Sequence, residues 1–140
     1  MAERTTATLA WQSGLRFEAR SQSGHTVTID APGRPGHTGA GPMEHLLIAV
    51  AGCTAMDVVA ILEKMHQQLT GLEVEIAGDR AATHPKYYTA LTLTYRLSGR
   101  ALDRDKVERA VSLSHSTYCS ALASLRPDCS VTTAIEITEA

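Results

Sequence analysis

The sequence predicts an α+β fold with the element order β-β-β-α-β-β-α-β, largely antiparallel sheets and a long central helix. Short stretches of alternating apolar and polar residues predict the strands, and one long apolar stretch after a glycine-rich loop predicts the central helix. Turn residues join most strands into hairpins, which favours antiparallel pairing and the α+β class. At 140 residues, the chain is expected to form a single domain over residues 1–140.

The first three strands are predicted at residues 6–11, 15–19 and 27–29, with tight turns at Ser13-Gly14 and Ser23-Gly24. The next stretch, residues 31–42, contains four glycines and three prolines. Such a composition predicts a loop, and loops of this length often carry function.

The central helix is predicted to begin at Pro42, because proline is well tolerated at the first helical position. It is expected to run to about residue 68 and to be stopped by Gly71. A helix of that length spans roughly 40 Å. Between residues 46 and 60 it is apolar on most sides, which is typical of a helix buried in a large core or between subunits.

In the second half of the chain, alternating residues and a helix-capping residue predict three more strands and a second helix. Alternation predicts half-buried strands at residues 72–76 and 91–97, and a final strand at residues 131–138. Asp103 is predicted to cap a second helix, which is expected to end at Arg126-Pro127-Asp128.

The composition argues against several classes of protein. The net charge is −2 and no basic patch is present, so no nucleic-acid partner is expected. The longest apolar run, residues 46–51, is far shorter than a membrane span, and the first six residues contain no apolar signal core. We therefore expect no membrane association and a cytoplasmic location. Three cysteines without a CxxC motif argue against a static disulfide framework.

Cys53, in the middle of the central helix, is the first candidate for thiol chemistry. The alternative is an inert core thiol, because free cysteines on apolar helix faces usually have no reactivity. Gly52 favours a site, since an interior helical glycine costs roughly 1 kcal/mol and often marks a close approach of a backbone or a ligand. Asp57 lies on the same face, and an unpaired carboxylate would raise the thiol pKa. Either a cation offsets Asp57 or its partner lies elsewhere, in a structural role.

Cys119, in the middle of the predicted second helix, has His115 one turn before it. His115 is either a base or hydrogen-bond partner for the thiol, or a partly exposed histidine beside a core cysteine. Cys53, Cys119 and His115 lack the ligand spacing of structural zinc sites, so no metal site is expected. Cys129 is interpreted as structural.

Glu44 lies in the first turn of the central helix, where a carboxylate interacts favourably with the helix dipole. At about 100° per residue, it lies roughly 180° around the helix from Cys53. If Glu44 assists Cys53, it is expected to do so from a second subunit.

These residues resemble the OsmC/Ohr family, named for the osmotically inducible protein C and the organic hydroperoxide resistance protein. The family pattern is a glycine-rich loop, Asn/Ser-Pro-x-Glu-x-Leu, and a long helix with a cysteine after small residues. Here it reads Gly39-Ala-Gly-Pro-Met-Glu-His-Leu, followed by Gly52-Cys53. The second family cysteine is matched by Tyr118-Cys119-Ser120. The stretch after Gly52 is most similar to the YhfA-like branch.

The resemblance implies the OsmC-like fold as an intertwined homodimer, and a thiol-dependent peroxidase that prefers organic hydroperoxides. Cys53 would attack the peroxide, and its sulfenic acid would condense with Cys119. A small dithiol reductant, of the lipoyl type, would reduce that disulfide. Glu44 would orient an active-site arginine. No cofactor is expected.

The arginine is where this chain departs from the family. The hydroperoxide-resistance branch has Gly-Gly-Arg-Asp-Gly in the turn after the first strand, whereas this chain has Gln12-Ser13-Gly14. Arg16 is the nearest candidate, and Arg34 matches the position used in the osmotically inducible branch; each is alternatively a surface residue. Without an arginine, a non-peroxidase redox or small-molecule-binding protein on the same dimeric fold is the alternative. A metal-binding or purely structural dimer is the third possibility.

Overall fold

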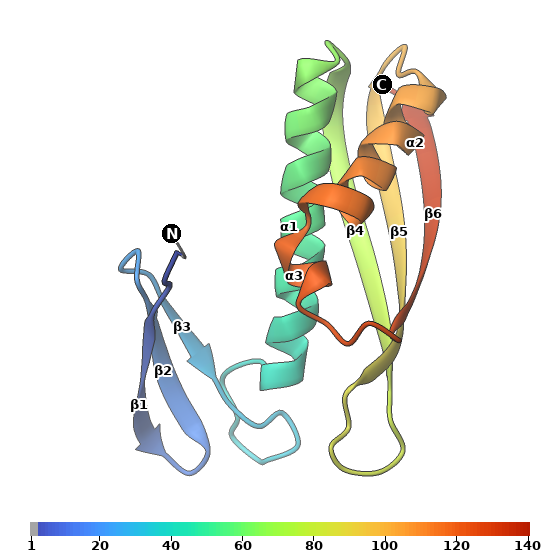
Figure 1. Ribbon diagram of the computed structural model, residues 1–140. Coiled ribbons are helices and arrows are strands. Elements are labelled where there is room, and N and C mark those ends of the chain that lie inside the picture. The colour runs from blue at the N-terminus through green and yellow to red at the C-terminus, as the bar shows by residue number, and fades with distance from the viewer. Residues whose placement is uncertain (1–2) are drawn as a thin grey trace. The chain divides into compact units, whose positions relative to one another are not determined.

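The computed structural model describes residues 3–140 and divides into two compact units, the described residues up to Leu46 and Leu47–Ala140. The observed order is three strands, a long helix, two strands, a helical segment and a final strand, as Figure 1 shows. The α+β class and the predicted order are therefore confirmed. The single-domain assignment for residues 1–140 stays a prediction, and each unit is described by itself.

The first unit contains β1 (Ala7–Ser13), β2 (Arg16–Ser21) and β3 (Thr26–Ile29), paired antiparallel in that order. Gly14 and Gly24 occupy the two predicted turns with positive φ angles, which glycine adopts without steric cost. Beyond β3, the Asp30 carboxylate accepts hydrogen bonds from the backbone N–H groups of Ala31 (2.7 Å) and Thr38 (3.0 Å). These bonds fix the path of the glycine-rich loop.

The helix α1 (Pro42–Lys64) begins at Pro42, as predicted. It ends before Gly71, so the predicted stop is wrong. The backbone N–H of Gln67 bonds to the Leu62 carbonyl, and that of His66 to the Glu63 carbonyl, with His66 at φ 57°. This is a Schellman motif in which a histidine replaces the usual glycine.

Gly71 instead lies within β4 (Gln68–Arg80), at a register shift opposite Ser98. A Cβ atom there would lie 2.6 Å from the Ser98 hydroxyl, which would have to rotate away to make room for it. β4 pairs antiparallel with β5 (Tyr88–Arg100), and β6 (Ser130–Glu139) pairs parallel with β5. Sheet pairing is thus largely antiparallel, as predicted, with one parallel pair that arises because a helical crossover joins β5 to β6.

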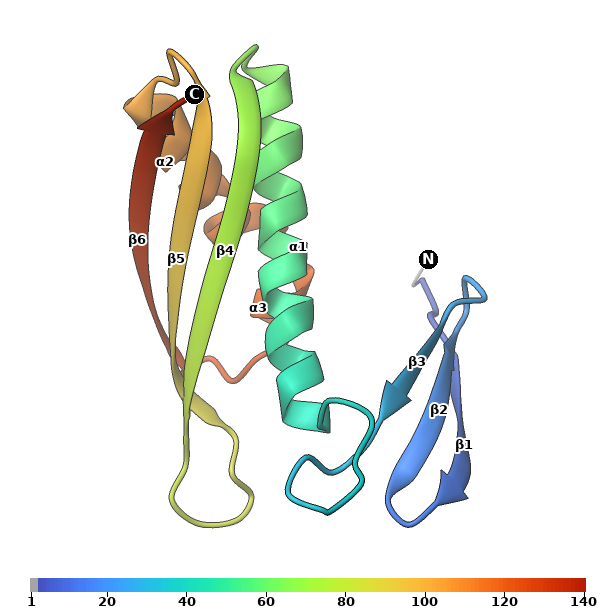
Figure 2. The same cartoon turned by 180° about the vertical axis from the view of Figure 1, so that it is seen from behind.

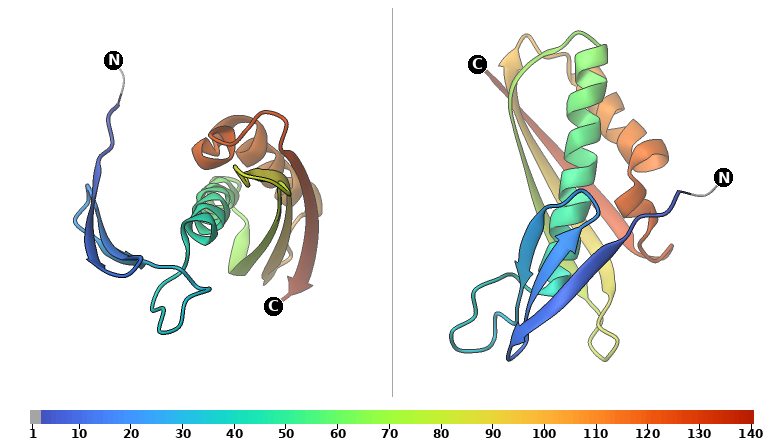
Figure 3. Two further views of the ribbon diagram at one scale, coloured as in Figure 1. Left: turned by 90° about the horizontal axis from the view of Figure 1, so that it is seen from below. Right: turned by 90° about the vertical axis from the view of Figure 1, so that its left-hand side faces the viewer.

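The core of the second unit lies between the helices and one face of the sheet β4–β5–β6. Figures 1 and 2, which view this unit from opposite sides, show α1 and the later helices on the same face. The left view of Figure 3 looks along the strands of this sheet and shows the helices on one side of it. The side chains that fill the core are at most 2% exposed: Val50, Thr54, Val58 and Leu62 of α1, and Leu91, Leu93, Tyr95 and Leu97 of β5.

The predicted second helix is broken into three pieces. Asp103 caps α2 (Arg104–Leu113), as predicted, by accepting hydrogen bonds from the N–H groups of Asp105 and Lys106. A π-helical turn, η1 (Ser114–Tyr118), and a short helix, α3 (Ser120–Ala123), follow. Cys119 lies between them with φ −74° and ψ 95°, so the prediction of a mid-helix position is wrong. The break falls in the run Ser-His-Ser-Thr-Tyr, whose residues have low intrinsic helix propensity.

By length and composition, α1 as a whole is apolar enough to cross a bilayer, unlike the short run 46–51 considered above. The core helix of a soluble protein passes the same test. In this structure the middle of α1 carries Thr54 and Asp57, whose side chains bond to β5 and η1. Those contacts are typical of a core helix.

Candidate functional site

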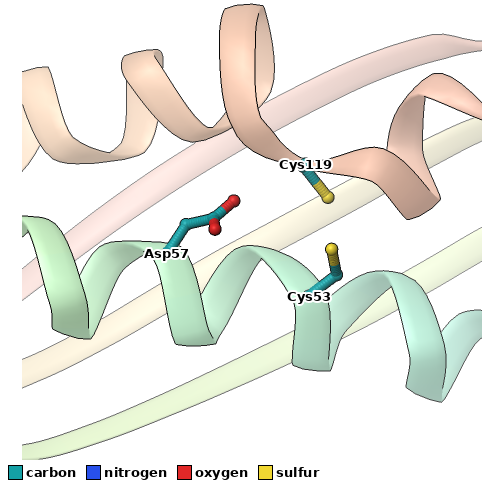
Figure 4. A group of neighbouring side chains, drawn as sticks. All are labelled: Cys53, Asp57 and Cys119. Carbon is teal, nitrogen blue, oxygen red and sulfur yellow. The ribbon is translucent and has the colours of Figure 1, made fainter. Parts of the chain in front are cut away.

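Two thiols and a carboxylate come together in the second unit. Cys53 and Asp57 project from the middle of α1, and Cys119 comes from the break between η1 and α3. Their sulfur and carboxylate oxygen atoms all lie within 4.8 Å of one another, and all three cysteines of the chain are free thiols. Figure 4 shows the two thiols turned toward each other, with the Asp57 carboxylate beside them.

The two thiols differ in their surroundings. Cys53 is half-buried, whereas Cys119 is 4% exposed. The pKa of the Cys119 thiol is raised to about 11, chiefly by burial and also by the neighbouring Cys53 and Asp57, while the backbone N–H of Leu122 acts in the opposite direction. Cys119 is therefore a neutral thiol at physiological pH. Cys53 is the more accessible of the two sulfur-bearing residues.

Asp57 has a partner within the site. The Ser114 hydroxyl donates a hydrogen bond of 2.8 Å to its Oδ2 atom. The alternative left open by the sequence, a cation or a partner elsewhere, is thus resolved in favour of a hydroxyl from η1. In residues 47–140, no arginine or lysine donates a hydrogen bond to Cys53 or Asp57.

Sequence reasoning missed a series of hydrogen-bonded polar side chains that continues from this Ser114–Asp57 bond. Thr54 Oγ1 lies 2.8 Å from Ser114 Oγ and 2.9 Å from the Tyr95 hydroxyl, and that hydroxyl lies 2.6 Å from His115 Nε2. Thr54, Ser114 and Tyr95 are at most 1% exposed. A serine in the otherwise apolar stripe of the second helix was the available signal, because a buried hydroxyl requires a partner.

The chain of hydroxyls has a distinct electrostatic character. The pKa of Tyr95 is raised to about 12, chiefly by burial, with Cys119 and Asp57 acting in the same direction and the Thr54 hydrogen bond opposing them. Burial lowers the pKa of His115. The imidazole that the sequence placed beside Cys119 is thus bonded to Tyr95 instead, and it lines a groove between α2, η1 and β6.

As a structural zinc centre, the group lacks a fourth protein ligand among the described residues. Among residues 3–140, no fourth histidine, cysteine, aspartate or glutamate joins Cys53, Asp57 and Cys119, and His115 is not part of the group. Tetrahedral zinc centres of the structural type use four protein ligands. Cys129, interpreted as structural, is half-buried and its Sγ atom lies 3.9 Å from the Ser130 carbonyl.

The remaining predicted site residues belong to the first unit. Arg16 Nε lies 3.3 Å from Asp30 Oδ2, while Arg34 is exposed, and both line a cavity of about 230 Å³. Glu44 Oε1 accepts the backbone N–H of Gly41 at 2.9 Å, which caps the start of α1. Cys53 belongs to the second unit. The roles expected for Arg16, Arg34 and Glu44 at Cys53 stay predictions.

An apolar groove of about 750 Å³ runs along α1 and β4 in the second unit. Its lining includes Ile48, Met56 and Val59, of which Met56 is 75% exposed. Gly52 also lines this groove, and a Cβ atom there would meet nothing within 4 Å. The close approach expected at Gly52 is therefore not made by the described residues of this chain.

Comparisons with known proteins agree with the sequence motifs. The family model described as OsmC-like protein matches residues 35–134. Protein YhfA of Escherichia coli (strain K12) is 37% identical over 134 residues, which cover 96% of this chain and 98% of YhfA.

Solved structures show the same fold. A hypothetical protein from Aquifex aeolicus has a TM-score of 0.89 at 27% identity, with 99% of each chain covered. An organic hydroperoxide resistance protein OsmC from Legionella pneumophila, also described as a predicted redox protein, has a TM-score of 0.72 at 16% identity, covering 97% of this chain and 98% of that one. The latter likeness is one of fold alone. Because the family match covers most of the chain and YhfA aligns over nearly its whole length, this chain belongs to the OsmC-like protein family.

Proposed function

We propose that the protein is a thiol-dependent peroxidase that reduces organic hydroperoxides and serves defence against oxidative or osmotic stress in the cytoplasm. The observation that carries this proposal is the pair Cys53 and Cys119, whose sulfurs lie within 4.8 Å of each other in unequal surroundings. An accessible thiol with a second thiol close by suits a peroxidatic cysteine and its resolving partner.

The reaction proceeds in two steps. The Cys53 thiolate attacks the distal oxygen of the hydroperoxide, the O–O bond breaks, and the alkoxide takes a proton to leave as an alcohol. Cys53 is then a sulfenic acid, and the Cys119 sulfur attacks its sulfur. The S–O bond breaks, water leaves with the proton of Cys119, and a Cys53–Cys119 disulfide forms.

Closing the disulfide brings the sulfurs to about 2.0 Å, so one side chain must move. Cys119 is suited to this because it lies in the extended break between η1 and α3 rather than inside a helix. A small dithiol of the lipoyl type then attacks the disulfide, becomes oxidised itself, and returns both cysteines to thiols.

Activation of Cys53 is assigned to Arg16 or Arg34 of a homodimer, with Glu44 as the carboxylate that orients the guanidinium. A homodimer is supported by the exposed apolar groove along α1 and by the exposed side chains Leu9 and Trp11 of β1. Exposed apolar side chains grouped along a groove can mark an interface.

A second candidate function is supported by the same groove. Its apolar lining and volume fit a fatty or aromatic ligand, and the Asp57 carboxylate near the thiols disfavours a thiolate. In that case the protein is a non-peroxidase redox or small-molecule-binding member of the family.

Thiol counting decides between the two. Reduced protein is treated with stoichiometric cumene hydroperoxide or hydrogen peroxide, and free thiols and linked peptides are measured by titration and mass spectrometry. We expect rapid loss of two thiols, a Cys53–Cys119 linked peptide, and faster reaction with the organic peroxide.

Three variants sharpen the test. Cys53→Ser is expected to abolish the reaction, and Cys119→Ser to stop it at a Cys53 sulfenic acid that dimedone traps. Cys129→Ser is the matched control and is expected to behave as the wild type. Thiols that survive both oxidants, or oxidise without the Cys53–Cys119 linkage, reject the peroxidase and leave the binding protein.

A further inference from the structure

We propose that Asp57 is the proton-transfer group of the Cys53–Cys119 pair, and that Ser114, Thr54 and Tyr95 connect it to His115, which lines the groove between α2, η1 and β6. The relay rests on the proposed function for its purpose, although its proton transfers can be measured without a peroxide. It consists of four consecutive hydrogen bonds of 2.6–2.9 Å.

The direction of each hydrogen bond in the relay follows from the number of hydrogens that each group carries. Each hydroxyl has a single hydrogen. Ser114 donates its hydrogen to the Asp57 carboxylate, so Thr54 must donate to Ser114. Tyr95 must then donate to Thr54, and His115 to Tyr95, which places a hydrogen on Nε2. All four donors therefore point from His115 toward Asp57.

Hydrogen bonds aligned in this way can transfer a proton from one end of the relay to the other while each side chain stays in place. When a cationic His115 gives its Nε2 proton to Tyr95, each hydroxyl passes its own hydrogen on, and Asp57 becomes a carboxylic acid. His115 keeps its Nδ1 hydrogen and is neutral. The reverse shift returns the proton to His115 and restores the carboxylate, so no atom is gained or lost within the chain.

Asp57 transfers a proton in two steps of the thiol cycle, the closing and the opening of the disulfide. It accepts the hydrogen of the Cys119 thiol as that sulfur attacks the sulfenic acid, and it donates a hydrogen to the departing hydroxide, which leaves as water. When the dithiol opens the disulfide, Asp57 protonates the departing Cys119 thiolate. Its own proton is replaced through the relay from water in the groove.

The properties of the groups fit this role. A thiol with a pKa of about 11, as at Cys119, requires a base to lose its proton at neutral pH. Tyr95, with a pKa of about 12, stays a neutral hydroxyl that both donates and accepts. Burial lowers the pKa of His115, which eases release of a proton. Thr54 and Ser114 are the other two bridging hydroxyls.

The solvent end of the relay is a groove of about 610 Å³. Besides His115, its charged lining residues are Arg104 and Glu108 of α2, which form an ion pair of 3.2 Å; β6 contributes Val131, Thr133 and Ile135. The inner end faces Cys53 and Cys119. These are the titratable and charged groups that the pH dependence of the relay must include.

A purely structural network is the alternative, since a satisfied buried network also fixes the packing of α1 on η1 and β5. Substitutions at Thr54 distinguish the proton relay from the purely structural network. Thr54→Val keeps the shape of the side chain and breaks the relay, whereas Thr54→Ser keeps the hydroxyl. Asp57→Asn removes the proton acceptor, and His115→Gln keeps a possible N–H donor without titrating. Ser112 lines the groove but is not part of the relay, so Ser112→Ala is the control.

The first measurement is the rate of Cys53–Cys119 disulfide formation after one equivalent of cumene hydroperoxide, in H2O and D2O, from pH 5 to 9. We expect Asp57→Asn to slow this step about 100-fold, within the usual range for loss of a general acid–base group. The relay supplies a net proton only when the disulfide is opened, so the same profile is recorded for reduction of the disulfide by a small dithiol. For that step, Thr54→Val and His115→Gln are expected to lose the pH dependence and solvent isotope effect of the wild type. Thr54→Ser should restore both, and Ser112→Ala should not change them.

The second measurement needs no peroxide: the pH dependence of iodoacetamide alkylation at Cys53, resolved by peptide mass spectrometry. A step that disappears in Thr54→Val and His115→Gln but remains in Thr54→Ser supports the relay, even if peroxide does not react. Variants that change only the urea midpoint, with wild-type pH profiles and isotope effects, overturn the relay and leave the peroxidase proposal untouched.

Discussion

In the second unit, a stripe of α1 packs on β5 with side chains that are at most 2% exposed, whereas in the first unit every residue of β1 is exposed. The buried side chains in the described residues up to Leu46 are Ala19 and Asp30. A three-stranded sheet with so little core is not expected to be stable alone. The loop of this unit is instead organised by the Asp30 carboxylate and its backbone partners.

This difference bears on function. The thiols are carried by the unit with the large core, which can hold two sulfurs and a carboxylate in a fixed geometry. The candidate arginines, Arg16 and Arg34, are carried by the unit with little core. We infer that the first unit requires contact with further protein surface, and that such contact would also decide where those guanidinium groups lie.

The largest expected effect is on stability and separates the two cores directly. Leu93→Ala, in the centre of β5, is expected to lower the free energy of unfolding by about 2–5 kcal/mol, because it leaves a cavity in a packed core. Leu9→Ala, on exposed β1, is expected to change it by no more than about 0.5 kcal/mol in dilute, monomeric protein, where the proposed homodimer interface is not formed. Urea denaturation followed by circular dichroism measures both. A Leu9→Ala loss as large as that of Leu93→Ala would show that β1 is buried in the assembled protein.

An intermediate effect is expected on association. Met56→Glu places a charge in the apolar groove of α1, and a charge buried without a partner in an interface costs at least about 2 kcal/mol, or roughly thirtyfold in the dimer dissociation constant. Sedimentation velocity over a concentration series measures this. Lys106→Glu, on the exposed face of α2, is the control and should leave the dissociation constant unchanged. A chain that is monomeric before any substitution contradicts the proposed homodimer.

The smallest effect is the pH dependence that Cys119 gives to the second unit. Because its folded pKa is raised to about 11, the folded state keeps a proton that the unfolded state releases. Stability is therefore fully present below the unfolded pKa near 9 and falls as pH rises toward 11, by at most about 1.4 kcal/mol per pH unit. Urea midpoints between pH 8 and 10 test this, since Tyr95 adds its own loss of stability only above about pH 10. Cys119→Ser should show a shallower slope, and Cys129→Ser the wild-type slope. Parallel slopes for all three proteins would contradict the assignment.

The two helices show how far local signals reach. Pro42 and Asp103 mark the two helix starts correctly, because capping and proline preferences act on the adjacent backbone. The end of α1 was misplaced because His66, rather than a glycine, adopts the left-handed conformation. Cys119 was misplaced because hydrophobic spacing continues across η1 and α3 although the backbone does not.

The sequence by itself determined the family, the order of strands and helices, the start of each helix and the identity of the candidate thiols. Those conclusions depend on composition, periodicity and motifs, which are local properties. Only the tertiary structure decided the parallel pairing of β6 with β5, the surroundings of Cys119 and the chain from Asp57 to His115. In this row of hydrogen bonds, Thr54 is bonded to Tyr95, 41 residues away in sequence, and to Ser114, 60 residues away. Contacts of that range form only when α1, η1 and β5 pack together, and no local pattern encodes them.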